Sequence, residues 1–393
     1  MRKIKILGLP GDKHEGACAH YRVFGPLRAL QRAGFCDMYI PHANEYGHRT
    51  VALNQDGRKD PLDPMLVNNY DLIVLQRQPD QDVGTLITEC NGLGIGTCFD
   101  IDDSVFSITP KNPNYVVWGR DKRKVRQLAT LYIRSGSVPE ILRGKTPEQI
   151  VELSIKIRAG IINNIRSASL VTVTTPSLAS EYGAHNSNIH VLPNQMDLDG
   201  WGELESTPHP GRIWITWAGG WTHKDDLALL AAPLQAIIQM YDNVDLVLIG
   251  FEQAKDLVFS GIPEDRIVLF PWTKNIYDYR SSLASADIVL APSEGVKFND
   301  SKSDIRVMEG WLAAKAPAVG SPTTYGQTIR ESGGGLVAKN SKQWVTALRK
   351  LINNTALRKA MGEKGYKYTI EQRTYDANVQ LWIDAYTSLL GGL

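Results

Sequence analysis

The sequence predicts an α/β protein made of two Rossmann-like, doubly wound domains that face a cleft. Short apolar runs alternate with longer amphipathic runs along most of the 393 residues. A polar segment rich in glycine and proline, residues 197–211, interrupts this alternation near the middle of the chain and is the predicted linker. A chain of this length also exceeds what one ordinary core supports, so two domains of similar size are expected.

The first half of the chain contains five strand candidates, each a short run rich in apolar and β-branched residues. They are residues 3–9, 71–76, 94–101, 169–175 and 189–193. Between the first two, Tyr21, Phe24 and Leu27 recur at helical spacing and predict a helix over residues 19–33. Another helix is predicted to begin at Pro176.

The second half repeats this pattern after the linker. Its strand candidates are residues 212–220, 244–250, 266–272, 286–292 and 317–321, and a helix is predicted over residues 227–240. We therefore predict an N-terminal domain over residues 1–196 and a C-terminal domain over residues 211–370. A last helix, near residues 374–390, lies in a C-terminal segment (371–393) that is additional to the second sheet.

Composition favours an ordinary folded protein, with 43% hydrophobic and 22% charged residues. No apolar run approaches the length of about eighteen residues that a membrane span requires. The four cysteines are far apart and form no CxxC pair, so neither a zinc site nor a disulfide framework is indicated. A reducing, cytoplasmic environment and no metal cofactor are expected.

Charge is unevenly distributed although the formal net charge is only +1. Residues 118–166 carry eleven basic and four acidic side chains, a local net charge of +7. Solvated helix faces are one interpretation. The other is a surface for an anionic partner, either a polymer such as DNA or a membrane that the protein contacts peripherally.

Polar residues follow the strand candidate at residues 286–292, where an open parallel sheet binds its ligands. Ser303 is a candidate N-cap for the next helix, with Asp304 in its first turn, and both are candidate donor-binding residues. A helix N-terminus offers free N–H groups to an anion, and Lys302 and Arg306 add positive charge beside it. A diphosphate site is one interpretation of this pattern, and an exposed row of ion pairs is the other.

Two further features belong to the same predicted edge of the second sheet. Glu309, one turn into that helix, is placed to accept hydrogen bonds from a vicinal diol such as that of a ribose. The double glycine Gly219-Gly220 follows another strand candidate, with Lys224 just beyond it. Glycines at such a turn let backbone amides approach an anion closely.

These segments resemble the GT-B glycosyltransferases, and in particular glycosyltransferase family 4. The resemblance covers most of the chain and is strongest from Val191 to Ser321. It implies a nucleotide-diphosphate-sugar donor, such as a UDP-sugar, bound mainly by the C-terminal domain, and an acceptor bound mainly by the N-terminal domain. It also implies a C-terminal helix that crosses back onto the first domain.

The resemblance assigns donor-side roles by matching positions. Glu309 matches the second glutamate of the family's Glu-x7-Glu motif, which holds the ribose hydroxyls. The first position of that motif falls on Ser301, so its carboxylate is missing here, and Asn299 or Asp300 is the candidate replacement.

Other matches concern the diphosphate and the nucleobase. The basic residues that neutralise the departing diphosphate correspond to Lys224 and to Lys302 or Arg306, assisted by the amides of Gly219, Gly220 and Ser303. Trp272 and Thr273 correspond to the segment near the nucleobase, where Trp272 stacks on the base or, alternatively, is buried in the core. The loop that ends at Gly16 corresponds to one that closes over the donor.

Acceptor-side candidates come from the first half. His20, Tyr21 and Arg22 open its first helix, and Arg77 ends a strand candidate.

Asp102 and Asp103 follow the strand candidate at residues 94–101. They are candidate acceptors for a substrate hydroxyl, and Asp102 becomes the general base if the reaction inverts configuration. Structural capping is the alternative role for these carboxylates.

The resemblance implies a retaining, metal-independent transferase that acts on a glycan or a lipid-linked saccharide. In such a reaction the donor phosphate accepts the proton of the acceptor, so no protein base is needed. Three alternatives remain open: a phage-type enzyme that glycosylates hydroxymethylated bases in DNA, a sugar-nucleotide epimerase, and a non-catalytic protein that binds nucleotide sugars.

Overall fold

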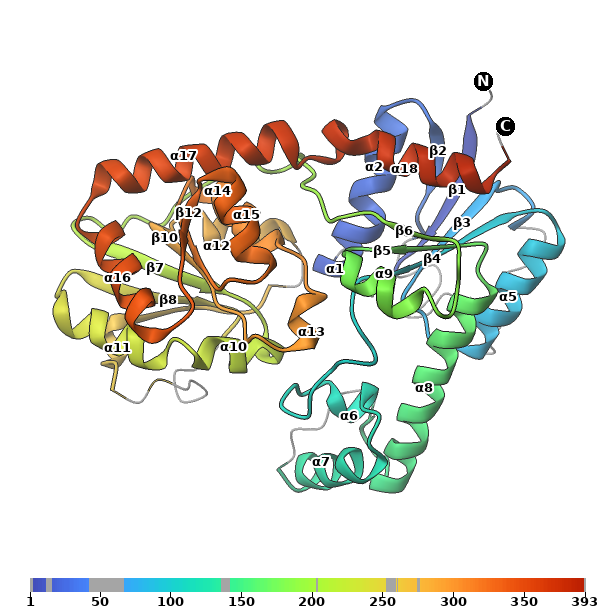
Figure 1. The fold of residues 1–393 in the computed structure, drawn as a ribbon, viewed down its shortest axis with the longest axis horizontal. Coiled ribbons are helices and arrows are strands. Elements are labelled where there is room, and N and C mark those ends of the chain that lie inside the picture. The colour runs from blue at the N-terminus through green and yellow to red at the C-terminus, as the bar shows by residue number, and fades with distance from the viewer. Residues whose placement is uncertain are drawn as a thin grey trace. The chain divides into compact units, whose positions relative to one another are not determined.

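The computed structural model describes residues 3–11, 16–41, 67–135, 142–202, 204–251, 259, 261–273 and 276–391. The chain divides into two compact units, one formed by Met1–Pro193 with Val379–Leu393 and the other by Asn194–Asn378. Each unit contains a six-stranded sheet flanked by helices (Figure 1). The predicted α/β class is confirmed, and the predicted linker belongs to the second unit.

The first unit is an open parallel sheet with the strand order β2-β1-β3-β4-β5-β6. Its strands are β1 (Ile4–Leu9), β2 (Cys36–Tyr39), β3 (Leu72–Gln76), β4 (Gly96–Ile101), β5 (Leu170–Val173) and β6 (Ile189–Val191). Its described helices are α1 (Ala17–Ala19), a π-helix (His20–Phe24), α2 (Gly25–Arg32), α5 (Gln81–Gly92), α6 (Tyr115–Trp118), α7 (Lys122–Ser135), α8 (Pro147–Ser167) and α9 (Pro176–Tyr182). The strand order reverses between β1 and β3, which makes the carboxyl ends of these strands the expected ligand-binding edge.

Helices α6 to α8 form a long crossover between β4 and β5, in place of a single helix (Figure 1). Helix α8 begins with a capping box, in which Thr146 and Gln149 bond each other's backbone amides. Gly160 lets this helix approach the loop between β3 and α5 closely, because an added Cβ would lie 1.7 Å from the carbonyl oxygen of Pro79.

The second unit has the strand order β12-β11-β10-β7-β8-β9, again parallel throughout. Its strands are β7 (Ile213–Ala218), β8 (Val244–Ile249), β9 (Ile267–Phe270), β10 (Ile288–Ala291), β11 (Ala318–Gly320) and β12 (Gly335–Val337). Its described helices are α10 (Lys224–Ala228), α11 (Ala231–Met240), α12 (Ile276–Leu283), α13 (Lys297–Asp300), α14 (Ile305–Ala314), α15 (Thr324–Ser332), α16 (Ser341–Ile352) and α17 (Thr355–Gln372), with 3-10 turns at Trp221–His223 and Glu264–Arg266. This is the strand order of a classic dinucleotide-binding sheet, and it reverses between β7 and β10.

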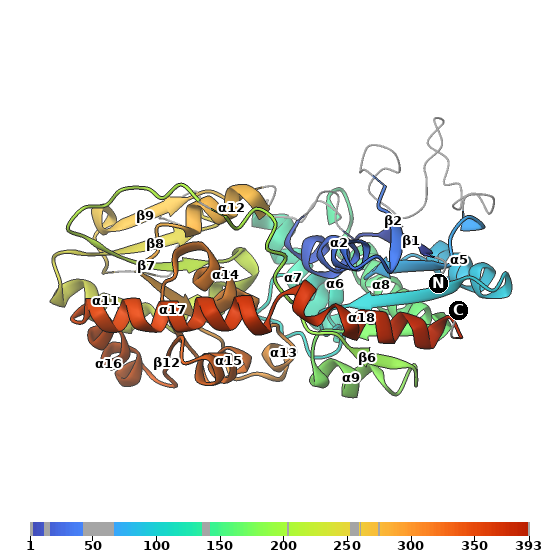
Figure 2. The same cartoon turned by 90° about the horizontal axis from the view of Figure 1, so that it is seen from above.

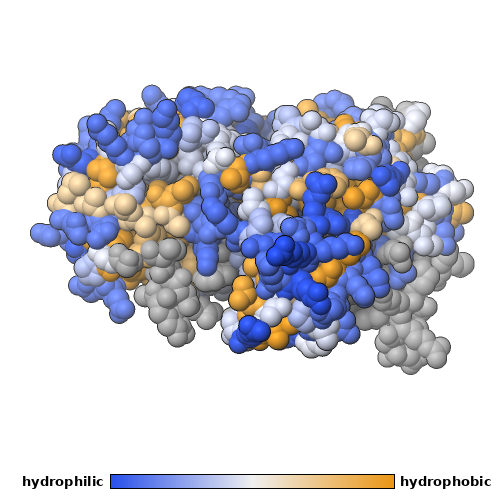
Figure 3. All heavy atoms as spheres, turned by 60° about the horizontal axis from the view of Figure 1, so that its bottom comes forward, coloured by the Kyte–Doolittle hydropathy of each residue, from blue (hydrophilic) through white to orange (hydrophobic). Residues whose placement is uncertain are grey.

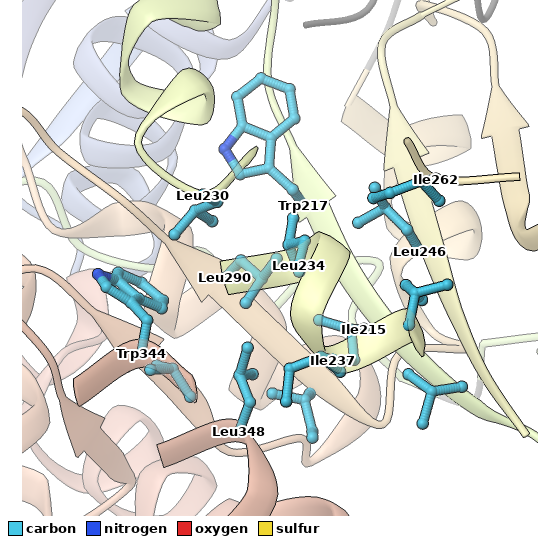
Figure 4. Close-up of a cluster of buried hydrophobic side chains, with 14 of the residues drawn as sticks. Ile215, Trp217, Leu230, Leu234, Ile237, Leu246, Ile262, Leu290, Trp344 and Leu348 are labelled. Atoms are coloured by element: carbon cyan, nitrogen blue, oxygen red, sulfur yellow. The ribbon is translucent and has the colours of Figure 1, made fainter. Parts of the chain in front are cut away.

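The larger core cluster of the second unit lies between its sheet and helices α11 and α16, and a smaller cluster that includes Leu283 of α12 packs separately. Figure 4 shows Trp217 and Leu290 from the strands among Leu234 of α11 and Trp344 and Leu348 of α16. All five side chains are buried. Their position fixes strands β7 and β10, whose carboxyl ends carry the polar loops of the predicted site.

The last helix, α18 (Tyr375–Leu389), follows α17 after a two-residue break, and both stand out in red in Figure 2. Most of α18 belongs to the first unit. It packs on β4, since an added Cβ on Gly96 would lie 3.1 Å from a methyl carbon of Leu389.

Two strands and two helix boundaries differ from the sequence-based expectation. Strands β2 and β12 were not predicted, and the helix expected over residues 227–240 is divided into α10 and α11. Helix α14 begins at Ile305, so Asp304 occupies the N-cap position that Ser303 was expected to fill.

Candidate functional site

At the carboxyl ends of β7, β8 and β9, three glycines on two turns lie close to the aromatic side chain of Trp272. Gly219 and Gly220 follow β7, and Gly250 follows β8 with a φ of +103° that favours glycine. An added Cβ on Gly250 would lie 2.3 Å from the carbonyl oxygen of Gly219. An added Cβ on Gly220 would lie 3.2 Å from the ring of Trp272. Any residue larger than glycine at these positions would therefore occupy the space at this edge of the sheet.

Arg306 is the most unusual side chain at this edge. It is only 8% exposed, yet no group among the described residues hydrogen-bonds its guanidinium, and Nη1 is buried without a partner. The guanidinium carbon lies 5.4 Å from the centre of the Trp217 ring and 5.7 Å from that of Tyr325. An added Cβ on Gly219 would come within 3.1 Å of Nη2. The sequence prediction that the double glycine and Arg306 share one site is therefore consistent with this geometry.

A buried arginine without hydrogen bonds is costly, because the nearby carboxylates of Asp226 and Glu309 favour its charge but do not replace the hydrogen bonds that it makes to water. The aromatic rings offset part of that cost through cation–π attraction. The N–H groups of the guanidinium could donate hydrogen bonds to an anion with several acceptor oxygens.

Further unpaired polar atoms lie on the segments that lead into α14 and α15. The hydroxyl oxygens of Ser303, Thr323 and Thr324 are buried, and no hydrogen-bond partner is found for them within the described ranges. Helix α15 is tied to the start of α14 because Thr328 donates a hydrogen bond to Asp304. Hydroxyls and helix N-termini are donors suited to an anion.

Asp304 forms an ion pair that was not predicted from the sequence. Its two carboxylate oxygens accept hydrogen bonds from Arg373 at 2.6 and 2.9 Å, and Nε of Arg373 donates to Gln195 at 3.1 Å. We therefore correct the prediction of Asp304 as a donor-binding residue: its carboxylate holds the start of α14 against the segments around Gln195 and Arg373.

Glu309 lies one turn into α14 and is 5% exposed. Tyr279 of α12 donates a hydrogen bond of 2.9 Å to its carboxylate. Burial, together with the Glu309 carboxylate, raises the pKa of Tyr279 well above its usual value, so the phenol keeps its proton and remains a donor. This orienting tyrosine was not predicted, because nothing in the spacing of the sequence links α12 to α14.

Trp272 follows β9 and is 62% exposed, with one edge against Gly220. The alternative of a buried core tryptophan is therefore wrong. Its neighbour Thr273 is half-buried at the same strand end. An exposed indole beside a glycine turn is a surface on which a planar base can stack.

The remaining donor-side candidates differ in what they contact. The Gly219 amide donates a hydrogen bond to the carbonyl oxygen of Ile249 at 3.1 Å, so the prediction that it donates to the anion is wrong. Gly219 instead leaves space beside Arg306, because it has no side chain. Ser301 is buried and donates to its own segment at Phe298, and the ammonium of Lys302 lies 4.5 Å from the centre of the Phe298 ring.

Asn299, the candidate replacement for the missing carboxylate, is also engaged. Its amide nitrogen donates to Asp226 at 2.8 Å and to the backbone of Glu294 at 3.0 Å. Asp226 in turn contacts His223, the residue before Lys224, at 3.2 Å. Neither His223 nor Asp226 was singled out from the sequence.

The first unit brings together three predicted acceptor-side residues at the ends of β3 and β4. A terminal nitrogen of Arg77 lies 3.5 Å from Asp102 and 3.3 Å from Asp103, and all three side chains are partly exposed. Arg77 has a φ of +47°, a conformation that costs a non-glycine residue about 1 to 3 kcal/mol. Such strain is typical of binding sites, which supports the predicted location without showing what binds there.

The other acceptor-side candidates are buried instead of exposed. His20, Tyr21 and Arg22 are 1%, 3% and 3% exposed, so the prediction that they contact an acceptor is wrong. Arg22 forms a bidentate ion pair with Asp100, and its Nη1 donates to the carbonyl oxygen of Leu192 at 2.7 Å.

The loop that ends at Gly16, which the resemblance predicted to close over the donor, lies largely outside the described residues. Gly16, at its end, precedes α1 and accepts a hydrogen bond from the amide of His20 at 2.8 Å.

In the described part of the chain, no three histidine, cysteine or acidic side chains are grouped so that they could hold a metal ion. None of the helices within the described ranges combines the length and apolar character needed to cross a bilayer.

Residues 245–384 match a family model described as glycosyl transferase-like. The matched segment contains β9, the polar loop after β10, and helices α14 and α17. A comparison with curated proteins finds no match.

Solved structures share the fold over almost the whole chain. Sucrose-phosphate synthase from Thermosynechococcus elongatus has 14% identity and a TM-score of 0.59, with 100% of both chains covered. HepE from Anabaena, solved with UDP and glucose, has 13% identity and a TM-score of 0.57, covering 98% of this chain and 99% of that one. WaaG, a glycosyltransferase involved in lipopolysaccharide biosynthesis, has 14% identity and a TM-score of 0.56, covering 99% and 100%.

At these identities the likeness concerns the fold, while the family match concerns the segment that carries the unpaired arginine. Residues 245–384 thus match a glycosyl transferase-like family model, and the whole chain shares the GT-B fold of these solved structures.

Proposed function

We propose that the chain transfers a sugar from a nucleotide-diphosphate-sugar donor to an acceptor hydroxyl, with the diphosphate bound between the Gly219-Gly220 turn and the start of α14. The observation that carries this proposal is the buried Arg306, which lacks a hydrogen-bond partner among the described residues. A UDP-sugar is the first candidate, since HepE was solved with UDP and glucose.

Each donor-side residue has a role that follows from its chemistry. Arg306, with Lys302 and Lys224, balances the negative charge of the diphosphate, assisted by the Gly220 amide. Ser303, whose hydroxyl is buried without a partner within the described part of the chain, donates to a phosphate oxygen.

The nucleoside is held at two other points. Glu309, oriented by Tyr279, accepts hydrogen bonds from the ribose hydroxyls. Trp272, exposed at the end of β9, stacks on the base.

The reaction follows from where charge develops. As the bond between the anomeric carbon and the diphosphate oxygen breaks, its electron pair stays on that oxygen and the sugar acquires oxocarbenium character. Preorganised donors aimed at the developing charge are usually the largest catalytic term. We propose that configuration is retained, that the departing phosphate accepts the proton of the acceptor hydroxyl, and that no metal ion is required.

Donor binding can be measured by thermal shift against UDP-, GDP-, ADP- and dTDP-sugars. A ligand at one hundred times its dissociation constant stabilises the fold by about 2.7 kcal/mol, which corresponds to several degrees in Tm for a domain of this size. We expect one nucleotide series to produce this shift and Glu309→Ala to abolish most of it.

Tyr279→Phe is the matched control, because it removes the hydrogen bond to Glu309 but leaves the carboxylate for the ribose. A shift that Glu309→Ala leaves unchanged would refute the ribose assignment. Donor binding without transfer to any acceptor would indicate a non-catalytic binding protein, and turnover of donor alone to an isomer would indicate an epimerase.

The acceptor is proposed to be a glycan or a lipid-linked saccharide that binds near Arg77, Asp102 and Asp103. The basic segment, residues 118–166, favours a second candidate. Seen with α6–α8 turned forward, Figure 3 shows a deep blue, strongly hydrophilic area broken by orange hydrophobic residues. Leu131 of α7 is 59% exposed on this segment. A DNA acceptor with hydroxymethylated bases would use such basic residues to contact phosphates.

Salt dependence separates the two acceptors. With a neutral saccharide acceptor, we expect the transfer rate to change less than about threefold between 50 and 200 mM NaCl, since few ions are displaced. A DNA acceptor held by six to ten phosphate contacts would lose about 10³- to 10⁵-fold in affinity over this range. A steep loss of activity with salt would therefore reverse the order of the two candidates.

A further inference from the structure

His223 and Asp226 form a hydrogen-bonded pair between the double-glycine turn and α10. Nδ1 of His223 lies 3.2 Å from Oδ2 of Asp226. The other oxygen of Asp226 accepts hydrogen bonds of 2.8 Å from the Glu294 amide and from Asn299. Asp226 is thus fixed as a hydrogen-bond acceptor, because its partners are donors. Nδ1 of His223 must carry a proton to complete the pair, and Nε2 is the nitrogen left for another partner.

The second ring nitrogen of His223, Nε2, belongs to a partly exposed side chain. No group in the described part of the chain hydrogen-bonds Nε2, and the side chain is 26% exposed. The backbone amide of His223 donates to Gly220 at 3.0 Å, which places the residue directly on the double-glycine turn. The imidazole is therefore held at two points beside the proposed diphosphate site.

The charges around this imidazole come from three elements. Arg306 belongs to α14, Lys302 lies between α13 and α14, and Asp226 belongs to α10 next to Lys224. Burial, and then the positive charges of Arg306 and Lys302, lower the pKa of His223 below its usual value despite the hydrogen bond to Asp226. The imidazole is therefore neutral at pH 7 when the site holds no anion.

A bound diphosphate changes this balance. Its two negative charges offset Arg306 and Lys302 and present acceptor oxygens, both of which favour the imidazolium form. We propose that His223, held by Asp226, takes up a proton when the donor binds and donates a hydrogen bond from Nε2 to the diphosphate. This inference rests on the proposed function and adds a residue that neither the sequence motif nor the family match assigns.

The bound imidazolium also serves the transfer step. When the bond from the anomeric carbon to the diphosphate oxygen breaks, the electron pair remains on that oxygen, and the Nε2–H group stabilises the added charge. The proton stays on His223 through this step, while the acceptor proton passes to the departing phosphate. Product release then returns the proton of His223 to solvent.

Calorimetric titration of the full chain with UDP-glucose tests the proposal, using two buffers of different ionisation enthalpy at pH 7. The intact sugar nucleotide is the right probe, because UDP itself has a terminal phosphate that titrates near pH 6. We expect wild type to take up a substantial fraction of one proton per donor bound. Its affinity should rise by up to about tenfold from pH 8 to pH 6, since one unit of pKa change corresponds to a factor of ten.

His223→Gln keeps a hydrogen-bonding side chain but cannot titrate. We expect it to bind UDP-glucose with no proton uptake and with an affinity that does not depend on pH. The control is His190→Gln, which removes a histidine of β6 in the first unit and should leave the wild-type proton count unchanged.

Each outcome decides between the proposals. Donor binding by wild type without proton uptake, or equal uptake by His223→Gln, would overturn the role of His223 and leave the proposed function intact. Failure of wild type to bind UDP-, GDP-, ADP- and dTDP-sugars alike would overturn both. Because the wild-type proton count is itself decisive, a His223→Gln variant that does not fold leaves the test valid.

Discussion

Replacing Arg306 with methionine should lower kcat/KM for glycosyl transfer by about 10²- to 10³-fold, the usual cost of removing one preorganised donor from a developing negative charge. The guanidinium is the cation most firmly placed for this role, because it lies between Trp217 and Tyr325 and against the Gly219 turn. Steady-state kinetics with the donor identified by thermal shift will measure the loss.

The same Arg306→Met variant should not lose stability, although it loses activity. Arg306 is buried without hydrogen bonds to other described residues, so methionine removes a desolvated charge and keeps much of the packing. We expect the Tm of the unliganded protein to stay the same or rise. Arg330→Met, which removes an exposed cation from α15, is the matched control and should leave kcat/KM unchanged. Activity of Arg306→Met within about threefold of wild type would contradict the assignment.

Replacing Arg22 with methionine should cost the first unit about 3 to 5 kcal/mol, because it leaves Asp100 buried and without its counter-ion. The two side chains are 1% and 3% exposed and share a contact of 2.6 Å. Among the described residues, Asp100 would keep one hydrogen-bond donor, the hydroxyl of Thr172 at 2.7 Å. Urea unfolding followed by circular dichroism should show an earlier transition than in wild type.

A double variant separates the pair from its packing. Arg22→Met with Asp100→Leu removes both charges, so it should recover a large part of the loss, as replacement of whole buried ion pairs often does. A single variant that loses less than about 1 kcal/mol would show that the pair is hydrated or flexible. The carbonyl oxygen of Leu192, which Arg22 also binds, loses its partner in both variants and so does not distinguish them.

The inner strands of both sheets could be predicted from the sequence, and so could the edge strands β6 and β9, but the edge strands β2 and β12 could not. Residues 71–76 and 244–250 are nearly continuous apolar runs, as expected for the centre of a parallel sheet, and they became β3 and β8. Strand β12, by contrast, is three residues long and begins at Gly335, where an added Cβ would lie 1.9 Å from the carbonyl oxygen of Ala318. Close approach of β11 demands glycine there, and glycine weakens the strand signal.

Within the candidate site, the residues that carry the chemistry were easier to predict than the direction and the partners of their side chains. Arg306 and Glu309 were singled out because charge followed a buried strand, and the structure places both at that edge. No local pattern indicated that Asp304 binds Arg373 or that Tyr279 binds Glu309, since these partners are 69 and 30 residues apart. Which way Trp272 or Tyr21 points depends on packing that no local pattern encodes.

The most direct test of the account is a crystal structure of the protein with a bound UDP-sugar, or with the nucleotide sugar that thermal shift selects. We predict that the diphosphate oxygens lie within hydrogen-bond distance of the Arg306 guanidinium and the Gly220 amide, with Glu309 on the ribose and the ring of Trp272 parallel to the base. A diphosphate bound away from the carboxyl ends of β7 and β10, with Arg306 still lacking a partner, would contradict the central claim.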